Sequence, residues 1–128
     1  MVRSTYIVVL LTAATAISLS ARAFAQSFHN APAPAAQMKN PYSADGQASV
    51  GGKKLYAQNC AQCHGNELQG IGPAPALMSV SVKNASAGDL FWFITNGDLS
   101  KGMPSWPNLT KQQRWQIVTF LKSRNDAK

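Results

Sequence analysis

The chain has 128 residues, with 12 lysines and arginines, five aspartates and glutamates and two cysteines, so its formal net charge is +7. This length is enough for one small domain. The excess of positive charge favours an acidic protein partner through electrostatic steering. No basic helix is interleaved with aromatic residues, so composition and pattern argue against nucleic-acid binding.

Residues 1–25 have the organisation of a secretory signal peptide. Arg3 provides a positive start, residues 7–19 form an apolar run, and Ala23-Phe24-Ala25 is a small-x-small cleavage site. The apolar run is short for a bilayer span, and an uncleaved anchor is the alternative. We therefore expect an exported, periplasmic protein that begins at Gln26 after cleavage and has no stable membrane insertion.

Residues 26–46 form the next segment, which is rich in alanine, proline, glutamine and asparagine. It contains too few large apolar side chains to form a core. The composition predicts a flexible, partly polyproline-like lead segment before a folded domain over residues 47–128. His29 and Met38 lie in this lead segment and are therefore poor candidates for structured ligands.

A first helix is expected over about residues 49–59. It carries Gly52 one turn before Tyr56, and a small residue one turn before an aromatic residue suits a close helix crossing. A simple pair of core residues is an equally good explanation.

Both cysteines of the chain occur in the pentapeptide Cys60-Ala61-Gln62-Cys63-His64. Helical residues three positions apart lie on one face, so both thiols can reach one flat group while the next residue offers an imidazole. This pattern favours covalent attachment of one haem c per chain through Cys60 and Cys63, with His64 as an iron ligand.

Other functions of a Cys-x-x-Cys pair are a thioredoxin-like redox pair, half of a zinc site and a local disulfide. A redox pair is expected within a βαβ pattern, which the sequence lacks. A zinc site needs two more ligands, and the only other histidine is His29. The histidine directly after the second cysteine therefore favours haem.

Glycines and prolines exclude a long regular element over residues 65–77. Ser86 and Asp89 have the spacing of a capping box. They open a helix over about residues 90–96, which Gly97 ends.

Residues 98–109 form another irregular stretch. Thr110 and Gln113 form a second capping box, which begins the last helix over about residues 111–123. No segment shows the alternation typical of a strand. The sequence predicts a small all-α fold with about three main helices and long loops wrapped around the haem, which fills the middle of the domain.

The candidates for a second axial ligand are His29, Met78 and Met103. Met78 follows His64 so closely that crossing to the opposite haem face would be awkward. Met103 lies beyond the middle helix, between a glycine and a proline. The pattern favours Met103, and a gap-filling core methionine is the alternative.

The sequence resembles the class I c-type cytochromes over about residues 47–122. Four features occur in the order of that family: Gly52 with Tyr56, the 60–64 motif, Gly72-Pro73, and Gly102-Met103-Pro104 before a closing helix. A narrower likeness, to small cytochromes associated with bacterial quinoprotein dehydrogenases, rests on Leu90-Phe91-Trp92-Phe93-Ile94, Met103-Pro104-Ser105-Trp106 and Gln113-Arg114-Trp115-Gln116.

The resemblance implies that Gly52 and Tyr56 cross the last helix near Ile117 and Phe120. In this family a proline matching Pro73 offers its carbonyl oxygen to the second nitrogen of the proximal histidine.

The neighbouring Pro75 leaves open which of the two prolines provides that carbonyl. Trp106 is a candidate donor to a haem propionate, and an aromatic residue covering the haem edge is the alternative for it.

The resemblance implies one-electron transfer without substrate chemistry, so we do not expect an enzyme. The expected function is a periplasmic carrier that accepts electrons from a dehydrogenase and passes them to a respiratory oxidase or cytochrome. The alternatives are a dedicated electron-accepting haem subunit of a quinoprotein dehydrogenase and an open-site haem protein that binds small gases. Residues that could guide an acidic redox partner to the haem edge are Lys53, Lys54, Lys83 and Lys101.

Overall fold

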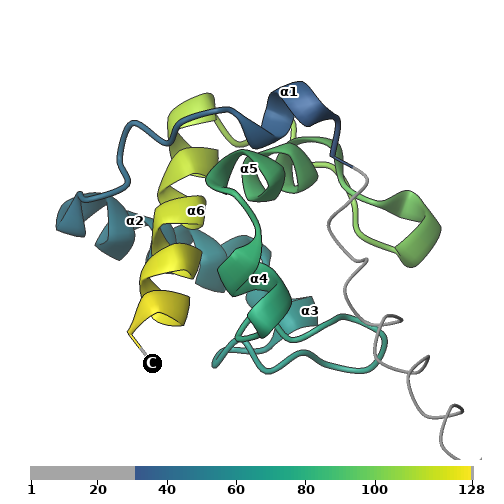
Figure 1. Cartoon of the computed structure of the whole chain (residues 1–128). Coiled ribbons are helices and arrows are strands. Elements are labelled where there is room, and N and C mark those ends of the chain that lie inside the picture. The colour runs from purple at the N-terminus through teal and green to yellow at the C-terminus, as the bar shows by residue number, and fades with distance from the viewer. Residues whose placement is uncertain (1–30, 128) are drawn as a thin grey trace, which may run out of the picture.

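A computed structural model describes residues 31–127, which fold into helices joined by loops. The expected signal peptide and His29 lie outside the described residues. In chain order the elements are α1 (Ala33–Ala36), α2 (Gly46–Asn59), α3 (Ala61–His64), α4 (Val80–Asn84), α5 (Ala87–Asn96), the 3₁₀ turn η1 (Leu99–Lys101) and α6 (Lys111–Asp126) (Figure 1).

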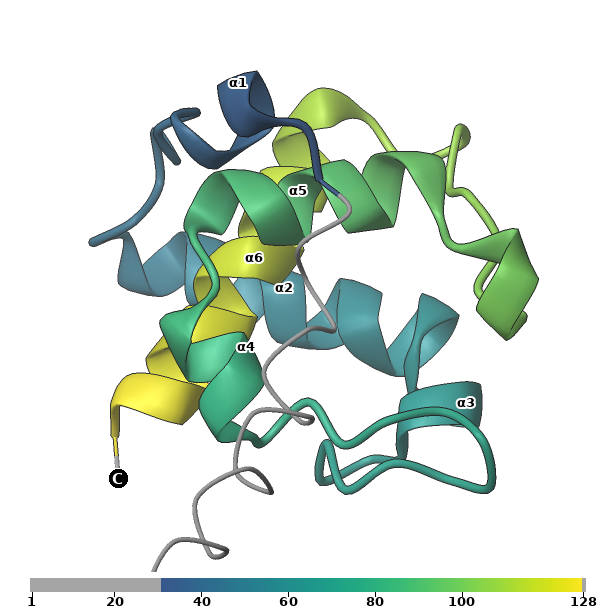
Figure 2. The same cartoon turned by 45° about the vertical axis from the view of Figure 1, so that its right-hand side comes forward.

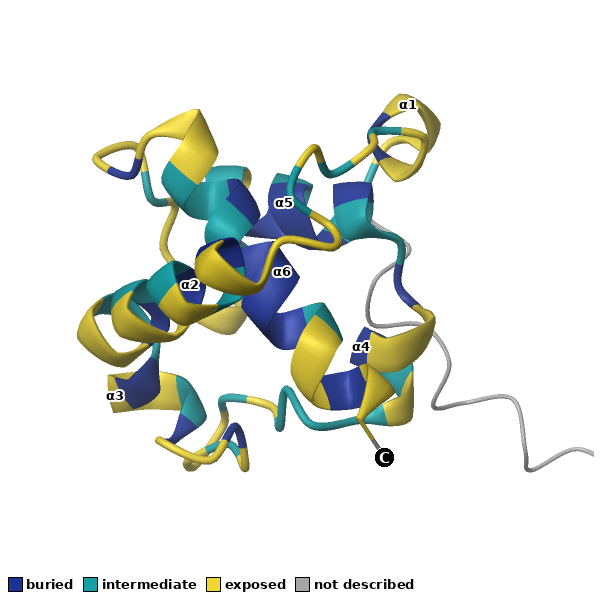
Figure 3. Ribbon diagram, turned by 90° about the vertical axis from the view of Figure 1, so that its left-hand side faces the viewer, coloured by how far each residue is buried: buried dark blue, intermediate teal, exposed yellow. Residues whose placement is uncertain are grey.

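The all-α class and the three main helices are confirmed, because α2, α5 and α6 are the long elements of the described chain. Between residues 31 and 127 the β structure is limited to two isolated bridges, Ile71 with Ala74 and Asp98 with Met103. Buried residues concentrate on α5 and α6 in the middle of the molecule (Figure 3). No helix within the described part of the chain has the length and apolarity needed to cross a bilayer.

Helices α2 and α6 cross at Gly52. A Cβ atom on this residue would lie 1.9 Å from the carbonyl oxygen of Gln116 and 3.0 Å from Cβ of Phe120. One turn later the ring of Tyr56 packs against Phe120, with 5.5 Å between centroids. The expected crossing of Gly52 and Tyr56 with the last helix is therefore confirmed. The closest approach of the two helices is at Gln116, one residue before Ile117.

Both expected capping boxes are present. At the start of α5, Ser86 Oγ accepts from the Asp89 amide, and the Asp89 carboxylate accepts from the Ser86 amide, each at 3.0 Å. At the start of α6, Thr110 and Gln113 exchange the equivalent bonds at 3.2 and 2.8 Å. These reciprocal bonds satisfy amides that have no partner within the helix.

Helix α4 lies in a stretch for which no element was predicted. Ser79 Oγ accepts from the Val82 amide at 3.3 Å and begins the helix. At its other end, Lys122 Nζ from α6 donates to the carbonyl oxygens of Lys83 and Ala85 at 2.6 and 3.1 Å. A cation stabilises the carbonyl end of a helix, so α4 depends on a long-range contact that local periodicity does not show.

Residues 31–46 were expected to be flexible, but they lie against α5 and α6 (Figures 1 and 2). Gly88 of α5 allows this approach, because a Cβ there would lie 1.8 Å from the carbonyl oxygen of Ala35. Asn40 Nδ2 donates to Thr119 Oγ1 of α6 at 2.9 Å. Small residues and side-chain hydrogen bonds hold the segment, in place of the large apolar residues whose absence suggested flexibility.

The crossing at Gly52 gives the first testable prediction. Gly52→Ala should lower the free energy of unfolding by about 1–3 kcal/mol, because the added methyl group meets backbone atoms and forces the helices apart. Denaturant unfolding of the purified protein measures this loss.

Gly51→Ala is the matched control on the same helix. A Cβ there meets the Gln116 side-chain nitrogen at 3.2 Å, and this flexible side chain can move. The control should be neutral or slightly stabilising, because alanine is the better helix former. Equal losses in the two variants would contradict a crossing set by backbone contact.

Candidate haem site

The Cys-x-x-Cys-His motif forms a single helical turn at the end of α2. The Cys60 amide donates to the Tyr56 carbonyl at 2.8 Å, which continues α2, while the Cys60 carbonyl accepts from Cys63 and His64 at 3.1 and 2.9 Å. Cys60 is half-buried, Cys63 is exposed, and neither forms a disulfide. The helical presentation expected from the spacing is therefore present.

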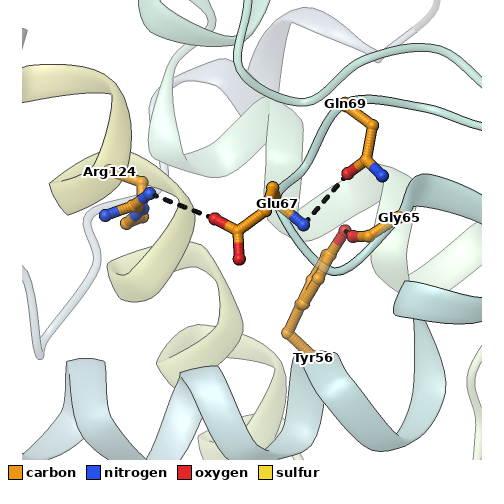
Figure 4. Close-up of polar contacts among 5 residues, drawn as sticks. All are labelled: Tyr56, Gly65, Glu67, Gln69 and Arg124. Atoms are coloured by element: carbon orange, nitrogen blue, oxygen red, sulfur yellow. Dashed lines mark hydrogen bonds and ion pairs between the residues drawn. The ribbon is translucent and has the colours of Figure 1, made fainter.

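Tyr56 fixes the end of this turn to α2. Its side chain is 2% exposed, and its hydroxyl donates to the carbonyl oxygen of Gly65 at 2.6 Å (Figure 4). Gly65 ends α3 with a φ of +79°, a backbone conformation that glycine adopts without strain. The long helix thus sets the orientation of the motif.

His64 contacts a carbonyl oxygen in the loop that follows it. Its Nδ1 lies 2.9 Å from the carbonyl oxygen of Pro75. A carbonyl group can only accept, so Nδ1 carries a proton, and in the neutral ring Nε2 then keeps a free lone pair. A neutral imidazole with a free Nε2 is the form that ligates iron.

The carbonyl carried over by resemblance was that of Pro73, and the structure places Pro75 there instead. The Ala74 amide donates to the Ile71 carbonyl at 3.1 Å, which closes a tight turn with Pro73 inside it. Pro73 is exposed in this turn, whereas Pro75 lies on the returning limb of the loop, beside His64.

Gly70 and Leu68 hold the two limbs of this loop together. Gly70 has a φ of +80°, and a Cβ there would lie 2.6 Å from the Ala74 carbonyl oxygen. Leu68, buried with a φ of +64°, accepts from the Leu77 and Met78 amides at 2.8 and 3.2 Å through its carbonyl. We call residues 68–77 the proximal loop.

Met103 lies in the segment after α5, and its backbone is fixed. Its carbonyl accepts from the Asp98 amide at 2.8 Å, and its amide donates to the Asp98 carbonyl at 3.0 Å. Gly97 permits this closure, since a Cβ there would lie 2.6 Å from the Met103 carbonyl oxygen. In two views, η1 and α3 lie on the same side of α6 (Figures 1 and 2).

The other residues considered at the sequence level occupy different surroundings. Met38, Met78 and Trp106 are partly buried and pack against the hydrophobic core. Met103 is also partly buried, but it is not among the partly buried side chains of the described chain that pack on this core.

Burial affects the ionisation of two residues at the site. Burial, with a smaller effect of neighbouring Cys63, raises the pKa of the Cys60 thiol to about 11. Burial, with a smaller effect of Cys60, raises the pKa of Tyr56 to about 12. A reactive redox cysteine needs a lowered pKa, so the environment of Cys60 does not favour the thioredoxin-like alternative.

Comparison with known proteins agrees with this geometry. Residues 48–121 match the family model described as cytochrome c oxidase, cbb3-type, subunit III. The chain is 34% identical over 92 residues to cytochrome c550 of Pseudomonas aeruginosa, a match that covers 66% of this chain and 61% of that protein. The fold is similar to the crystal structure of cytochrome CL from the marine methylotrophic bacterium Methylophaga aminisulfidivorans, with a TM-score of 0.57, 30% identity, and coverage of 67% of this chain and 66% of that one.

The chain thus spans less than two thirds of the length of each of these two proteins. Its helical fold and its Cys-x-x-Cys-His turn are those of a class I c-type cytochrome, an electron-transfer haem protein. The chain belongs to the family of c-type cytochrome domains whose model it matches, and haem c attached through Cys60 and Cys63 is its cofactor. The donor set fits this group, because two free thiols and an imidazole with an available Nε2 occupy one helical turn.

The buried Tyr56 hydroxyl predicts a loss of stability in alkali. Because the pKa is about 12 in the folded protein and ordinarily 10.0, this contribution to stability is complete below pH 10 and is lost as the pH rises through 12. Haem attachment removes the Cys60 charge but leaves the burial, so the direction stays the same. Denaturant unfolding at several pH values above 9 should show the decline.

Tyr56→Phe is the control for this titration. It should lower stability by about 1 kcal/mol near neutral pH through the lost hydrogen bond, and its stability should fall less steeply above pH 10. An unchanged slope in this variant would assign the alkaline loss to other groups.

Proposed function

We propose that this protein is a periplasmic one-electron carrier, not an enzyme, whose haem iron is held between His64 and Met103. The observation that carries the proposal is the hydrogen bond from His64 Nδ1 to the Pro75 carbonyl, which leaves Nε2 available beside the two cysteines. Residues 1–25 would direct export and be removed at the cleavage site after Ala25.

The bound haem supplies a one-electron couple between Fe(III) and Fe(II). The protein would hold the axial ligands and the Nδ1 proton of His64 in place, and no proton or chemical group would be transferred. His64 Nδ1 keeps its proton and donates it in a hydrogen bond to the Pro75 carbonyl oxygen, which makes the ring a stronger donor and lowers the reduction potential. A thioether ligand acts in the opposite direction, because it favours the reduced state.

Three observations support Met103 as the second ligand. Its backbone is held by two hydrogen bonds to Asp98. Its side chain does not serve the described core, whereas that of Met78 does. The Met78 amide is also tied to the Leu68 carbonyl at the base of the proximal loop.

Trp106 remains a candidate donor to a haem propionate. Its side chain packs against the core while staying partly exposed, which suits a residue at the edge of a cofactor. Pro73 would shape the turn of the proximal loop rather than contact the histidine.

The partners proposed are redox proteins with acidic docking surfaces: a dehydrogenase as donor and an oxidase or cytochrome as acceptor. Lys53 and Lys54 are exposed on α2, and Lys101 is exposed on η1, 3.7 Å from Asp98. Exposed charges of this kind speed encounters and are screened by salt. A shuttle must also release its partner quickly, which favours a small, hydrated interface.

The attachment proposal predicts the fate of the cysteine variants. Cys60→Ala or Cys63→Ala should weaken haem retention, because one thioether remains, and the double variant should lose covalent haem. Acid–acetone extraction followed by a reduced pyridine haemochrome spectrum measures retained haem and vinyl saturation, while intact mass measures the adduct. Gln62→Ala, an exposed position between the cysteines, is the matched control and should retain full haem. Native exported protein with the mass of the bare chain and no Soret absorbance would overturn the proposal.

The ligand proposal predicts a spectroscopic change in Met103→Ala. The oxidised wild-type protein should show a weak far-red band from sulfur-to-iron charge transfer, and this band should disappear in the variant. Met78→Ala is the control and should keep the band. A wild-type protein that is high-spin when oxidised and binds carbon monoxide readily would favour the open-site alternative. Loss of the band in Met78→Ala alone would move the ligand to that residue.

A further inference from the structure

The side chain of Asn125 lies in the last turn of α6, far along the chain from the haem motif. It is 5% exposed and makes three hydrogen bonds. Its Nδ2 donates to the carbonyl oxygens of Leu77 and Leu121 at 3.0 and 2.9 Å, and its Oδ1 accepts from the Ser79 amide at 3.2 Å. Only the bond to Leu121 belongs to the helix itself, so the other two join α6 to Leu77, the last residue of the proximal loop, and to Ser79 just after it.

These bonds fix the peptide units on either side of Leu77. The Leu77 carbonyl is held by Asn125, while its amide donates to the Leu68 carbonyl at 2.8 Å. Leu77 therefore has both backbone groups bonded to separate parts of the molecule. Because trans peptide units are rigid, little freedom remains in Ala76, the one residue between Pro75 and Leu77.

Pro75 is exposed, so its carbonyl takes its position from the flanking backbone and not from packing around its ring. The loop is held on one limb by Gly70, whose amide donates to the His64 carbonyl at 2.8 Å. On the returning limb the anchor is Leu77, whose side chain packs on the core and whose carbonyl oxygen is held by the Asn125 side chain.

We infer that Asn125 is a positioning residue for the proximal histidine: it holds the returning limb of the loop so that the Pro75 carbonyl accepts from His64 Nδ1. Through this bond it sets the donor strength of the ring and hence the reduction potential. The inference rests on the proposed ligation by His64. It assigns a redox role to a residue that contacts neither the motif nor the proline.

A neighbouring ion pair, between Arg124 and Glu67, does not account for the connection between α6 and the proximal loop. Arg124 lies 3.9 Å from Glu67 (Figure 4), with side chains 49% and 82% exposed. An ion pair this exposed contributes little to stability. The buried amide of Asn125 therefore carries the connection between α6 and the loop.

The test compares haem-loaded wild-type protein with Asn125→Ser. A serine can still bond the carbonyl four residues earlier in its own helix, so it keeps the bond to Leu121 but is too short to reach Leu77 and Ser79. In the reduced protein, exchange of the His64 Nδ1 proton by NMR should become roughly three- to tenfold faster, as expected when about one hydrogen bond no longer holds the acceptor. The reduction potential should rise, because a histidine with a weaker hydrogen bond is a weaker donor.

Thr119→Ala is the matched control. Thr119 is also a buried polar residue of α6, 4% exposed, but its long-range bonds go to Asn40 and to the Tyr42 carbonyl. It should lower the unfolding temperature without changing either histidine readout. Equal changes in Thr119→Ala, or wild-type exchange and potential in Asn125→Ser, would overturn the positioning role.

Asn125→Asp provides a second variant. The carboxylate can accept from Ser79 but cannot donate to Leu77, and it should give the same two shifts. If neither variant loads haem while Thr119→Ala does, Asn125 is a structural residue and the inference fails. Absence of a histidine Nδ1 signal and of histidine ligation in the wild-type protein would instead refute the proposed function itself.

Discussion

At Gly52 the backbones of α2 and α6 approach so closely that one additional carbon atom has no room. The haem-binding turn follows directly from the end of α2 and is fixed to it by Tyr56. The proximal loop is held near the other end of α6 by Asn125. One helix crossing therefore relates the cysteines and histidine to the carbonyl that orients the histidine, although these groups come from distant parts of the chain.

The helical elements could be predicted where their signals are local. Capping boxes and a closing glycine located α5 and α6. The pairing of Gly52 and Tyr56 allowed a helix crossing or a simple core pair, and the resemblance to c-type cytochromes indicated the crossing with α6 that the structure has. Helix α4 could not be found in this way, since its carbonyl end depends on Lys122 from α6. The docking of residues 31–46 was missed for a similar reason: Gly88 and Thr119, its contact points, gain their roles only after α5 and α6 are placed together.

In the haem site, too, the features with a local sequence signal could be predicted and those set by long-range contacts could not. The spacing of Cys60, Cys63 and His64 is a complete local signal, because one helical turn presents all three. The choice between Pro73 and Pro75 depends on where the proximal loop reverses direction, and two prolines separated by one alanine do not reveal this. Asn125 lies beyond the predicted end of the last helix, and a polar residue near a chain terminus gives no sign that it is buried.

The conformation of Leu68 has a consequence for how this protein can vary. Its left-handed backbone suits glycine, which would relieve a strain of about 1–2 kcal/mol, but its side chain is almost fully buried. Removing a buried leucine side chain costs about 2–5 kcal/mol, which exceeds that relief. No natural amino acid therefore both relieves the backbone strain at this position and fills the buried space. Leucine is a compromise here: its backbone is strained, but its buried side chain fills the space beneath the proximal loop.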